Sequence, residues 1–192
     1  MQRTETVERF RRAGKTPAGE VCYAVTNYQI RPIKPDEYDL LQDFLYEAIF
    51  IPEGAEAPPR DIINLPELQV YTREFGTQKD DACFVAAVGG RVVGAVWVRI
   101  MHDYGHIDDD TPSFAVSLYP AYRGHHIGTA LMQTMLKHLK QTGYRQASLS
   151  VQKENYAAEM YRKLGFQTIG ETDEEYRMVY RFPASESSLT ER

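Results

Sequence analysis

The sequence predicts an α/β fold whose helices pack on a mixed β-sheet, and three observations indicate this class. Hydrophobic residues make up 43% of the 192 residues and charged residues 26%, proportions that suit a chain with a normal buried core. Apolar residues recur at helical spacing in some segments and form short β-type runs in others. Strands joined through helices are usually parallel neighbours and hairpin strands are antiparallel, so the sheet is expected to be mixed.

The first expected element is a helix that follows Pro35. Asp36 can cap this helix, and its apolar residues recur at intervals of three and four. These residues are Leu40, Leu41, Phe44, Leu45, Ala48 and Ile49. Pro52 and the glycine- and proline-rich stretch after it end this helix, and a second helix is expected over 66–75.

A β-meander is expected next. Two apolar runs, ACFVAAV and RVVGAVWVRI, flank Gly89 and Gly90, which supply the positive φ angles of a two-residue hairpin turn. The polar loop HDYGHIDDDTP then leads to a third apolar run, SFAVSLY. The three runs therefore predict three consecutive strands.

The second half of the chain alternates helices and strands. A long helix is expected after Pro120, with an apolar stripe on one face and Gly143 just beyond its last turn. The run ASLSV predicts a short buried strand, and Asn155 opens another helix that ends near Gly165. FQTIGE and EYRMVYRF predict the last two strands.

Charge and composition limit the class of protein. The formal net charge is −5, which argues against a nucleic-acid-binding protein. No segment approaches the ~18 consecutive apolar residues of a membrane span, and the first residues are too polar for a signal peptide. Cys22 and Cys83 form no disulfide framework and lack zinc-ligand spacing, so a cytoplasmic protein is expected. We expect a polar extension at 1–20, one domain at 21–182 and a polar tail at 183–192.

The turn before the long helix carries the first functional signal. Its sequence over 122–129 is YRGHHIGT. The first turn of a helix has four backbone amides without internal partners and carries the positive end of the helix dipole. Gly124 and Gly128 would let a phosphate approach those amides, and Arg123 adds a positive charge. The same pattern also fits an ordinary turn that packs a helix against a strand.

The segment that starts at Asn155 carries the second signal. Taken alone, Asn155 is a helix cap and Tyr161 a packing residue. Together with the turn at 122–129, this segment resembles the GNAT superfamily of N-acetyltransferases, which use acetyl-CoA. The family's Asn-x-x-Ala-x-x-Tyr pattern and the residues after it are matched by Asn155, Ala158, Tyr161, Gly165 and Phe166.

The resemblance extends over roughly residues 28–182, with the hairpin, both motifs and the closing strand in the family's order. In the family's pyrophosphate signature, Gln/Arg-x-x-Gly-x-Gly/Ala, Arg123 fills the first position and Gly128 the last. His126 stands where the family usually has the inner glycine. A positive φ at that position would strain a histidine, although histidine tolerates this region better than most residues.

The resemblance implies a GNAT-like fold whose central mixed sheet splays between its fourth and fifth strands, with helices on both faces. It implies acetyl-CoA as co-substrate, and no metal is expected. The residues expected to bind acetyl-CoA are Val116, Ser117, Leu118, Arg123, Gly124, His125, His126, Ile127, Gly128, Thr129 and Asn155. Tyr161 is implied as the general acid that protonates the leaving CoA thiolate.

The acceptor side of the reaction is less defined by the sequence. The residues that could remove the proton of the amine are His106, Asp108, Asp109, Asp110, Glu47 and Asp61, and no spacing selects one. A metal site at His102, His106 and Asp108 is disfavoured by its loop position. The resemblance places several acidic and aromatic residues around the acceptor mouth, so a cationic amine is expected there; these residues are Glu53, Glu56, Asp108, Asp109, Asp110, Tyr71 and Tyr104.

Two classes of function follow from this pattern. The leading hypothesis is an N-acetyltransferase that moves an acetyl group from acetyl-CoA to a primary amine by direct attack. The alternative is a non-catalytic acyl-CoA-binding sensor or interaction module, which needs no phenol beside the thioester. Neither nucleic acid nor a membrane is an expected partner. The identity of the amine and the oligomeric state, a homodimer included, stay open.

Overall fold

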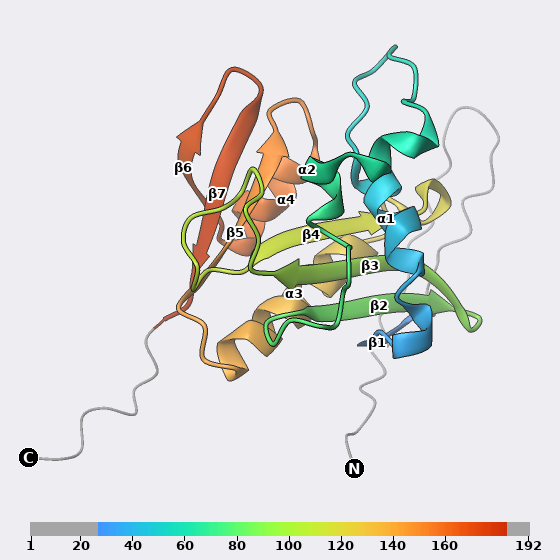
Figure 1. Ribbon diagram of the computed structural model, residues 1–192, viewed down its shortest axis with the longest axis horizontal. Coiled ribbons are helices and arrows are strands. Elements are labelled where there is room, and N and C mark those ends of the chain that lie inside the picture. The colour runs from blue at the N-terminus through green and yellow to red at the C-terminus, as the bar shows by residue number, and fades with distance from the viewer. Residues whose placement is uncertain (1–26, 184–192) are drawn as a thin grey trace, which may run out of the picture.

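The computed structural model describes residues 27–183 (Figure 1). The expected extension at 1–20, Cys22 and all but the first residue of the expected tail at 183–192 lie outside the described residues. Within the described part of the chain, no helix is both long and apolar enough to cross a membrane.

Within residues 27–183, seven strands form one sheet in the order β1-β2-β3-β4-β5-β7-β6. They are β1 (Gln29–Pro32), β2 (Ala82–Val88), β3 (Arg91–Arg99), β4 (Ser113–Leu118), β5 (Gln146–Gln152), β6 (Gln167–Glu171) and β7 (Glu175–Arg181). In this described sheet β4 and β5 are parallel, and the other neighbouring pairs are antiparallel. The mixed sheet confirms the predicted α/β fold class.

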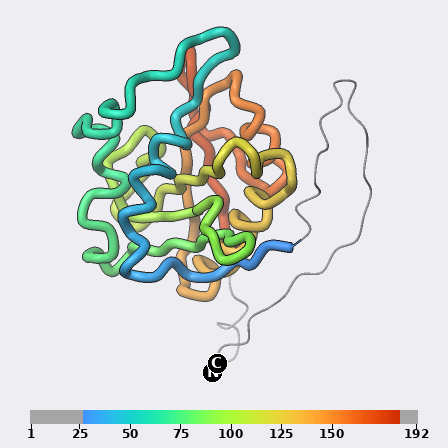
Figure 2. The backbone as a smooth tube through the Cα atoms, turned by 90° about the vertical axis from the view of Figure 1, so that its right-hand side faces the viewer, coloured from blue at the N-terminus to red at the C-terminus, as the bar shows by residue number. Residues whose placement is uncertain are grey.

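Helices cover both faces of the sheet. They are α1 (Leu40–Ala48), α2 (Pro66–Gln69), α3 (Ile127–Gln141) and α4 (Ala157–Leu164). Figure 1 shows α1 in front of the sheet and α3 behind it, and Figure 2 gives the view from the side. Successive side chains of β3 point to opposite faces of the sheet. Trp97 packs in a buried cluster with Phe44 of α1, and Val96 packs in another cluster with Leu131 of α3.

Several predicted elements differ in extent from the observed ones. Pro35–Glu37 forms a separate 3₁₀ turn, so Asp36 does not cap α1, and Asp39 stands at its N-cap. The second helix covers Pro66–Gln69 and not 66–75. Strand β1 was not among the predicted strands.

The hairpin glycines were predicted correctly, because Gly89 and Gly90 have φ angles of 56° and 85°. Gly143, with φ 89°, directly follows Thr142, the C-cap residue of α3, as expected.

The parallel pair β4–β5 opens the sheet. The two strands pair at Ser113 and Ser148, near the start of each strand, and the amide of Ser148 donates to the carbonyl of Pro112 at 3.0 Å. Toward their carboxyl ends the strands diverge, as predicted for the fourth and fifth strands. Peptide groups on the facing edge of β4 beyond Ser113 are therefore left for another partner.

Candidate active site

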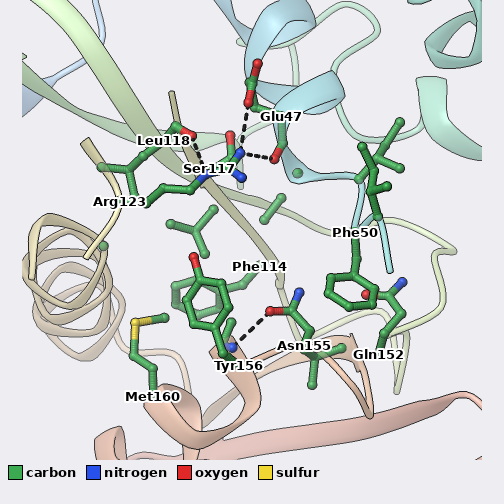
Figure 3. A pocket seen from close by; sticks show the side chains of 18 of the residues that line it. Glu47, Phe50, Phe114, Ser117, Leu118, Arg123, Gln152, Asn155, Tyr156 and Met160 are labelled. Atoms are coloured by element: carbon green, nitrogen blue, oxygen red, sulfur yellow. Dashed lines mark hydrogen bonds and ion pairs between the residues drawn. The ribbon is translucent and has the colours of Figure 1, made fainter. Parts of the chain in front are cut away.

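A cavity of about 1070 Å³ lies where β4 and β5 diverge (Figure 3). The predicted site residues that line it are Val116, Ser117, Leu118, Arg123, Gly124, His126, Gly128, Thr129, Asn155 and Tyr161. Two predicted residues do not line it. Ile127 is 1% exposed and packs in the core beneath α3, and His125 is half-buried beside the turn. These two residues can contribute only their backbone amides to a ligand in the cavity.

The start of α3 presents backbone amides to the cavity. His126 is the N-cap residue and has φ 61° and ψ 6°, the left-handed conformation that glycine adopts most easily. The strain considered from the sequence is therefore present. Gly128 follows in the first turn, where a Cβ atom would come within 3.3 Å of the Leu118 side chain. Gly128 therefore packs closely against Leu118, and the positive end of the helix dipole beside it suits an anion.

Arg123 is held by three hydrogen bonds at the edge of the cavity. Its Nε donates to the carbonyl of Leu118 at 3.0 Å, and its Nη2 donates to the carbonyl and the carboxylate of Glu47 at 3.1 and 2.8 Å (Figure 3). The side chain of Arg123 is 38% exposed, so one face of the guanidinium remains accessible. Its positive charge is already partly balanced by Glu47.

The α4 segment supplies the second part of the predicted site. Asn155 Oδ1 accepts a hydrogen bond from the amide of Ala157, the first residue of α4, at 2.9 Å, although the N-cap residue of the helix is Tyr156 and Asn155 stands one residue before it. Its Nδ2 group remains to donate to a ligand in the cavity. Tyr161 lines the cavity and is 8% exposed. Burial and the nearby Tyr156 raise the pKa of the Tyr161 phenol, which keeps it protonated at neutral pH.

The cavity is also lined by acidic and aromatic side chains from other segments. We use the name acidic wall for Glu53, Tyr71, Tyr104 and Glu175. The carboxylate of Glu175, the first residue of β7, accepts hydrogen bonds from Ser150 Oγ at 3.2 Å and Gln152 Nε2 at 3.1 Å. Glu175 was not predicted from the sequence, because nothing in the local pattern of its strand distinguishes it from an ordinary exposed carboxylate.

Several residues expected near the acceptor lie elsewhere. Of the expected bases, Glu47 lines the cavity, and those that do not line it are His106, Asp108, Asp109, Asp110 and Asp61. Glu56 does not line it either, so the expected mouth of acidic residues is wrong for Glu56 and for the three aspartates. These aspartates lie instead in the exposed loop between β3 and β4.

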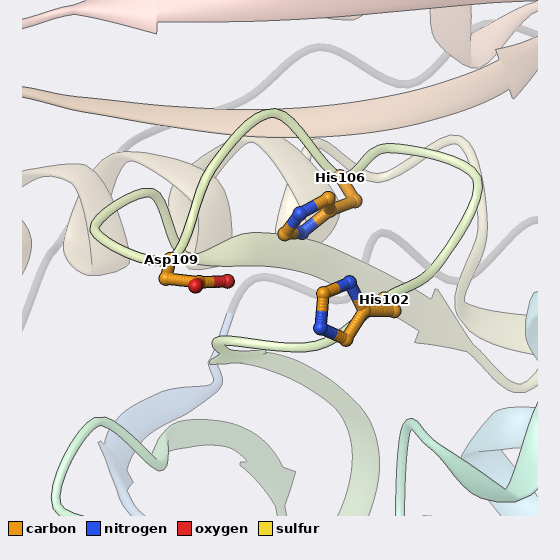
Figure 4. A group of neighbouring side chains, drawn as sticks. All are labelled: His102, His106 and Asp109. Carbon is orange, nitrogen blue, oxygen red and sulfur yellow. The ribbon is translucent and has the colours of Figure 1, made fainter.

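This loop brings three potential metal ligands together, His102, His106 and Asp109, each with a ligand atom within 4.8 Å of the others (Figure 4). The third member is Asp109 and not Asp108 as considered from the sequence. His106 Nδ1 lies 3.0 Å from the carbonyl of Met101, which leaves Nε2 for a ligand. None of the three lines the cavity, so this cluster is separate from the candidate active site.

Comparisons with known proteins agree with this geometry. A model of the acetyltransferase (GNAT) family matches residues 42–166. Mycothiol acetyltransferase of Saccharomonospora viridis is 32% identical over 123 residues, which is 62% of this chain and 40% of that protein. Mycothiol acetyltransferase of Catenulispora acidiphila is 34% identical over 86 residues, 43% of this chain and 27% of that protein. The chain thus spans well under half the length of these curated relatives.

Solved structures share the fold at low sequence identity. The PaiA N-acetyltransferase from Thermoplasma acidophilum, in complex with coenzyme A, has a TM-score of 0.61 and 17% identity over 81% of this chain and 99% of that chain. The ribosomal-protein-S18-alanine N-acetyltransferase from Escherichia coli has a TM-score of 0.59 and 16% identity over 84% of this chain and 98% of that chain.

Proposed function

Because the chain belongs to the acetyltransferase (GNAT) family, we propose that it is an N-acetyltransferase that moves the acetyl group of acetyl-CoA directly to a primary amine. One observation carries this proposal: a single cavity at the β4–β5 opening is lined both by the start of α3 and by Asn155 and Tyr161. The start of α3 suits the pyrophosphate of CoA, and Asn155 and Tyr161 suit its pantetheine arm and thioester. The cysteine content supports a cytoplasmic location.

In the proposed complex the pyrophosphate binds over the amides that follow Gly124, at the positive end of the α3 dipole. The pantetheine amides bind the free edge of β4, as an added strand would. Asn155 donates its Nδ2 group to a pantetheine carbonyl. These contacts place the thioester beside Tyr161.

The proposed reaction needs no covalent enzyme intermediate. The amine nitrogen attacks the thioester carbon and loses a proton, directly or through water, to a base in the cavity. A backbone N–H of β4 stabilises the negative charge that develops on the carbonyl oxygen. The C–S bond then breaks, and the Tyr161 hydroxyl gives its proton to the CoA thiolate. The tyrosinate regains a proton from solvent.

A thiol-release assay tests the proposal. Acetyl-CoA is incubated with the protein and a panel of amines and peptide N-termini, and both free CoA and the acetylated product are measured. We expect CoA release that depends on an amine, with equal amounts of acetylated amine. CoA binding without turnover for any amine would favour the acyl-CoA-binding module instead.

A further inference from the structure

Tyr71 of the acidic wall makes a directional hydrogen bond. Its hydroxyl donates to Asp103 Oδ2 at 2.9 Å, and Ser113 Oγ donates to the same oxygen at 2.8 Å. A phenol carries one proton, so a Tyr71 hydroxyl that donates to Asp103 has only lone pairs left for a ligand. In the cavity, Tyr71 is therefore an acceptor for an N–H group.

The backbone around Tyr71 is fixed by two buried side chains of β3. Trp97 Nε1 donates to the carbonyl of Tyr71 at 3.0 Å. Arg99, which is 2% exposed, donates to the carbonyls of Val70 and Arg73 at 3.0 and 2.9 Å. Because bonds from the sheet hold three of the four residues from Val70 to Arg73, the position of the Tyr71 ring is set before any ligand binds.

Asp103 is held equally firmly. Gly105, two residues later, lies so close to the sheet that a Cβ atom would be 2.7 Å from Ser113 Oγ and 3.0 Å from the carbonyl carbon of Leu149. The loop therefore cannot shift toward β4 and β5, and Asp103 stays beside Tyr71. Burial holds the pKa of Asp103 above its usual value, and the hydrogen bonds from Ser113 and Tyr71 offset only part of this shift.

The carboxylates near Tyr71 lack a cation. Asp103 and Glu175 both accept hydrogen bonds from neutral groups, and neither has an ion pair among residues 27–183. Burial and, after it, the negative charges of Asp103 and Glu175 raise the pKa of the Tyr71 phenol. The basic side chains that line the cavity, within the described residues, are Arg123 and His126, both in the turn before α3. A ligand cation at the acidic wall would balance this charge.

We propose that Tyr71, oriented by Asp103, and Glu175 form the site for the ammonium group of a cationic acceptor that has no carboxylate or phosphate beside its amine. This inference rests on the proposed function, since it names the class of amine. Tyr71 accepts an N–H from the ammonium, and Glu175 supplies the opposite charge. Asp103 is a positioning residue, which acts by turning the Tyr71 proton away from the ligand.

The first test substitutes Tyr71→Phe and measures KM for an alkyl diamine and for acetyl-CoA. Loss of a hydrogen bond to a charged group is expected to raise the diamine KM roughly 10- to 100-fold and to leave the acetyl-CoA KM unchanged. Tyr144→Phe is the matched control, because the Tyr144 hydroxyl donates to the carboxylate of Asp80, away from the cavity. An equal effect of both substitutions would overturn the proposal.

The second test separates positioning from folding. Asp103→Asn is expected to raise the diamine KM in the native background and to add little in Tyr71→Phe, because its effect passes through the Tyr71 hydroxyl. A purely structural role would instead lower Tm and add to the effect of Tyr71→Phe. The panel of amines in the thiol-release assay provides a further check. The kcat/KM of the diamine should be higher than that of an α-amino acid and that of a neutral aromatic amine. The reverse order would contradict the assignment.

Calorimetric binding of the diamine in the presence of CoA separates this inference from the proposed function. If no amine is acetylated, the transferase proposal fails, but diamine binding that is lost in Tyr71→Phe still supports the site. If amines are acetylated and neither KM nor binding responds to Tyr71→Phe, Asp103→Asn or Glu175→Gln, the site is wrong and the transferase proposal stands.

Discussion

The Arg123 guanidinium and the Glu47 carboxylate form an ion pair of 2.8 Å that joins the turn before α3 to the last turn of α1. Both residues line the cavity (Figure 3). The pair therefore fixes the position of Arg123 and also reduces the positive charge that it presents to an anion. A pyrophosphate at this site would have to share Arg123 with Glu47.

This relationship predicts opposite effects for the two partners. Arg123→Ala should weaken CoA binding by roughly 10- to 100-fold, because a charge-assisted hydrogen bond is lost. Glu47→Gln should strengthen CoA binding several-fold, since it removes a carboxylate beside the phosphates and frees Arg123. Calorimetry with CoA measures both. Pantetheine, which has no pyrophosphate, is the control ligand and should bind all three proteins equally; equal responses to CoA and pantetheine would rule out this location for the pyrophosphate.

The left-handed conformation of His126 predicts an unusual order of stabilities. Glycine relieves a backbone strain of about 1–2 kcal/mol, partly offset by about 0.4–1 kcal/mol from its freedom in the unfolded chain. His126→Gly should therefore be at least as stable as the native protein, and His126→Ala should be about 1 kcal/mol less stable than His126→Gly. Urea unfolding measures both. His125 does not have a positive φ, so there the alanine variant should be the more stable one; the same order at both positions would refute the strain at His126.

Local patterns were enough to predict much of the fold. The glycine pair at 89–90 specifies its hairpin within two residues, and the stripe of α3 is long enough for its period to be clear. Strand β1 has four residues, too few for a period, and ends in a proline. The helix expected over 66–75 ends at Gln69, and beyond it the carbonyls of Val70 and Arg73 accept hydrogen bonds from Arg99, contacts that cross more than twenty residues and that no local pattern reveals.

The two sides of the cavity also differ in how far the sequence could predict them. Arg123, Gly128 and Asn155 lie in short motifs at the starts of helices, so their places could be predicted from neighbouring residues. Tyr71 and Glu175 come from segments about a hundred residues apart, and both line the cavity only because the fold brings these segments to it. No local spacing relates them, which explains why the sequence selected no base and did not single out Glu175.

The Arg31–Glu37 pair predicts a loss of stability in acid. Two hydrogen bonds of 2.6 Å from Arg31 lower the pKa of Glu37 from 4.5 to about 2. Because the pKa is lower in the folded state, the stabilisation is complete above pH 4.5 and disappears as pH falls from 4.5 to 2. Glu37→Gln should cost about 1–3 kcal/mol at pH 7 and much less near pH 2, as measured by urea unfolding.

Glu159→Gln serves as the control for this pH dependence. The Glu159 side chain is 61% exposed and forms ion pairs only of the surface kind, with Arg162 and Lys163 at 3.9 and 3.6 Å. Its substitution should change stability by less than about 0.5 kcal/mol at either pH. A destabilisation by Glu37→Gln that is the same at pH 7 and pH 2 would show that the pair acts through packing and not through charge.

Removal of one atom, the hydroxyl oxygen of Tyr161, tests whether this residue is the general acid. Tyr161→Phe keeps the ring and its packing against Phe166 but removes the proton donor. If Tyr161 is the general acid, kcat should fall about 10²–10⁴-fold while the affinity for CoA is nearly unchanged.

The matched control is Tyr156→Phe, because Tyr156 also lines the cavity but is 73% exposed and open to solvent. Steady-state kinetics and CoA calorimetry measure both variants. The raised pKa of Tyr161 further implies that native activity does not decline through its ionisation below about pH 10. Normal turnover by Tyr161→Phe would make Tyr161 a packing residue and leave the thiolate to depart through water, and a large loss in Tyr156→Phe alone would assign the proton to Tyr156.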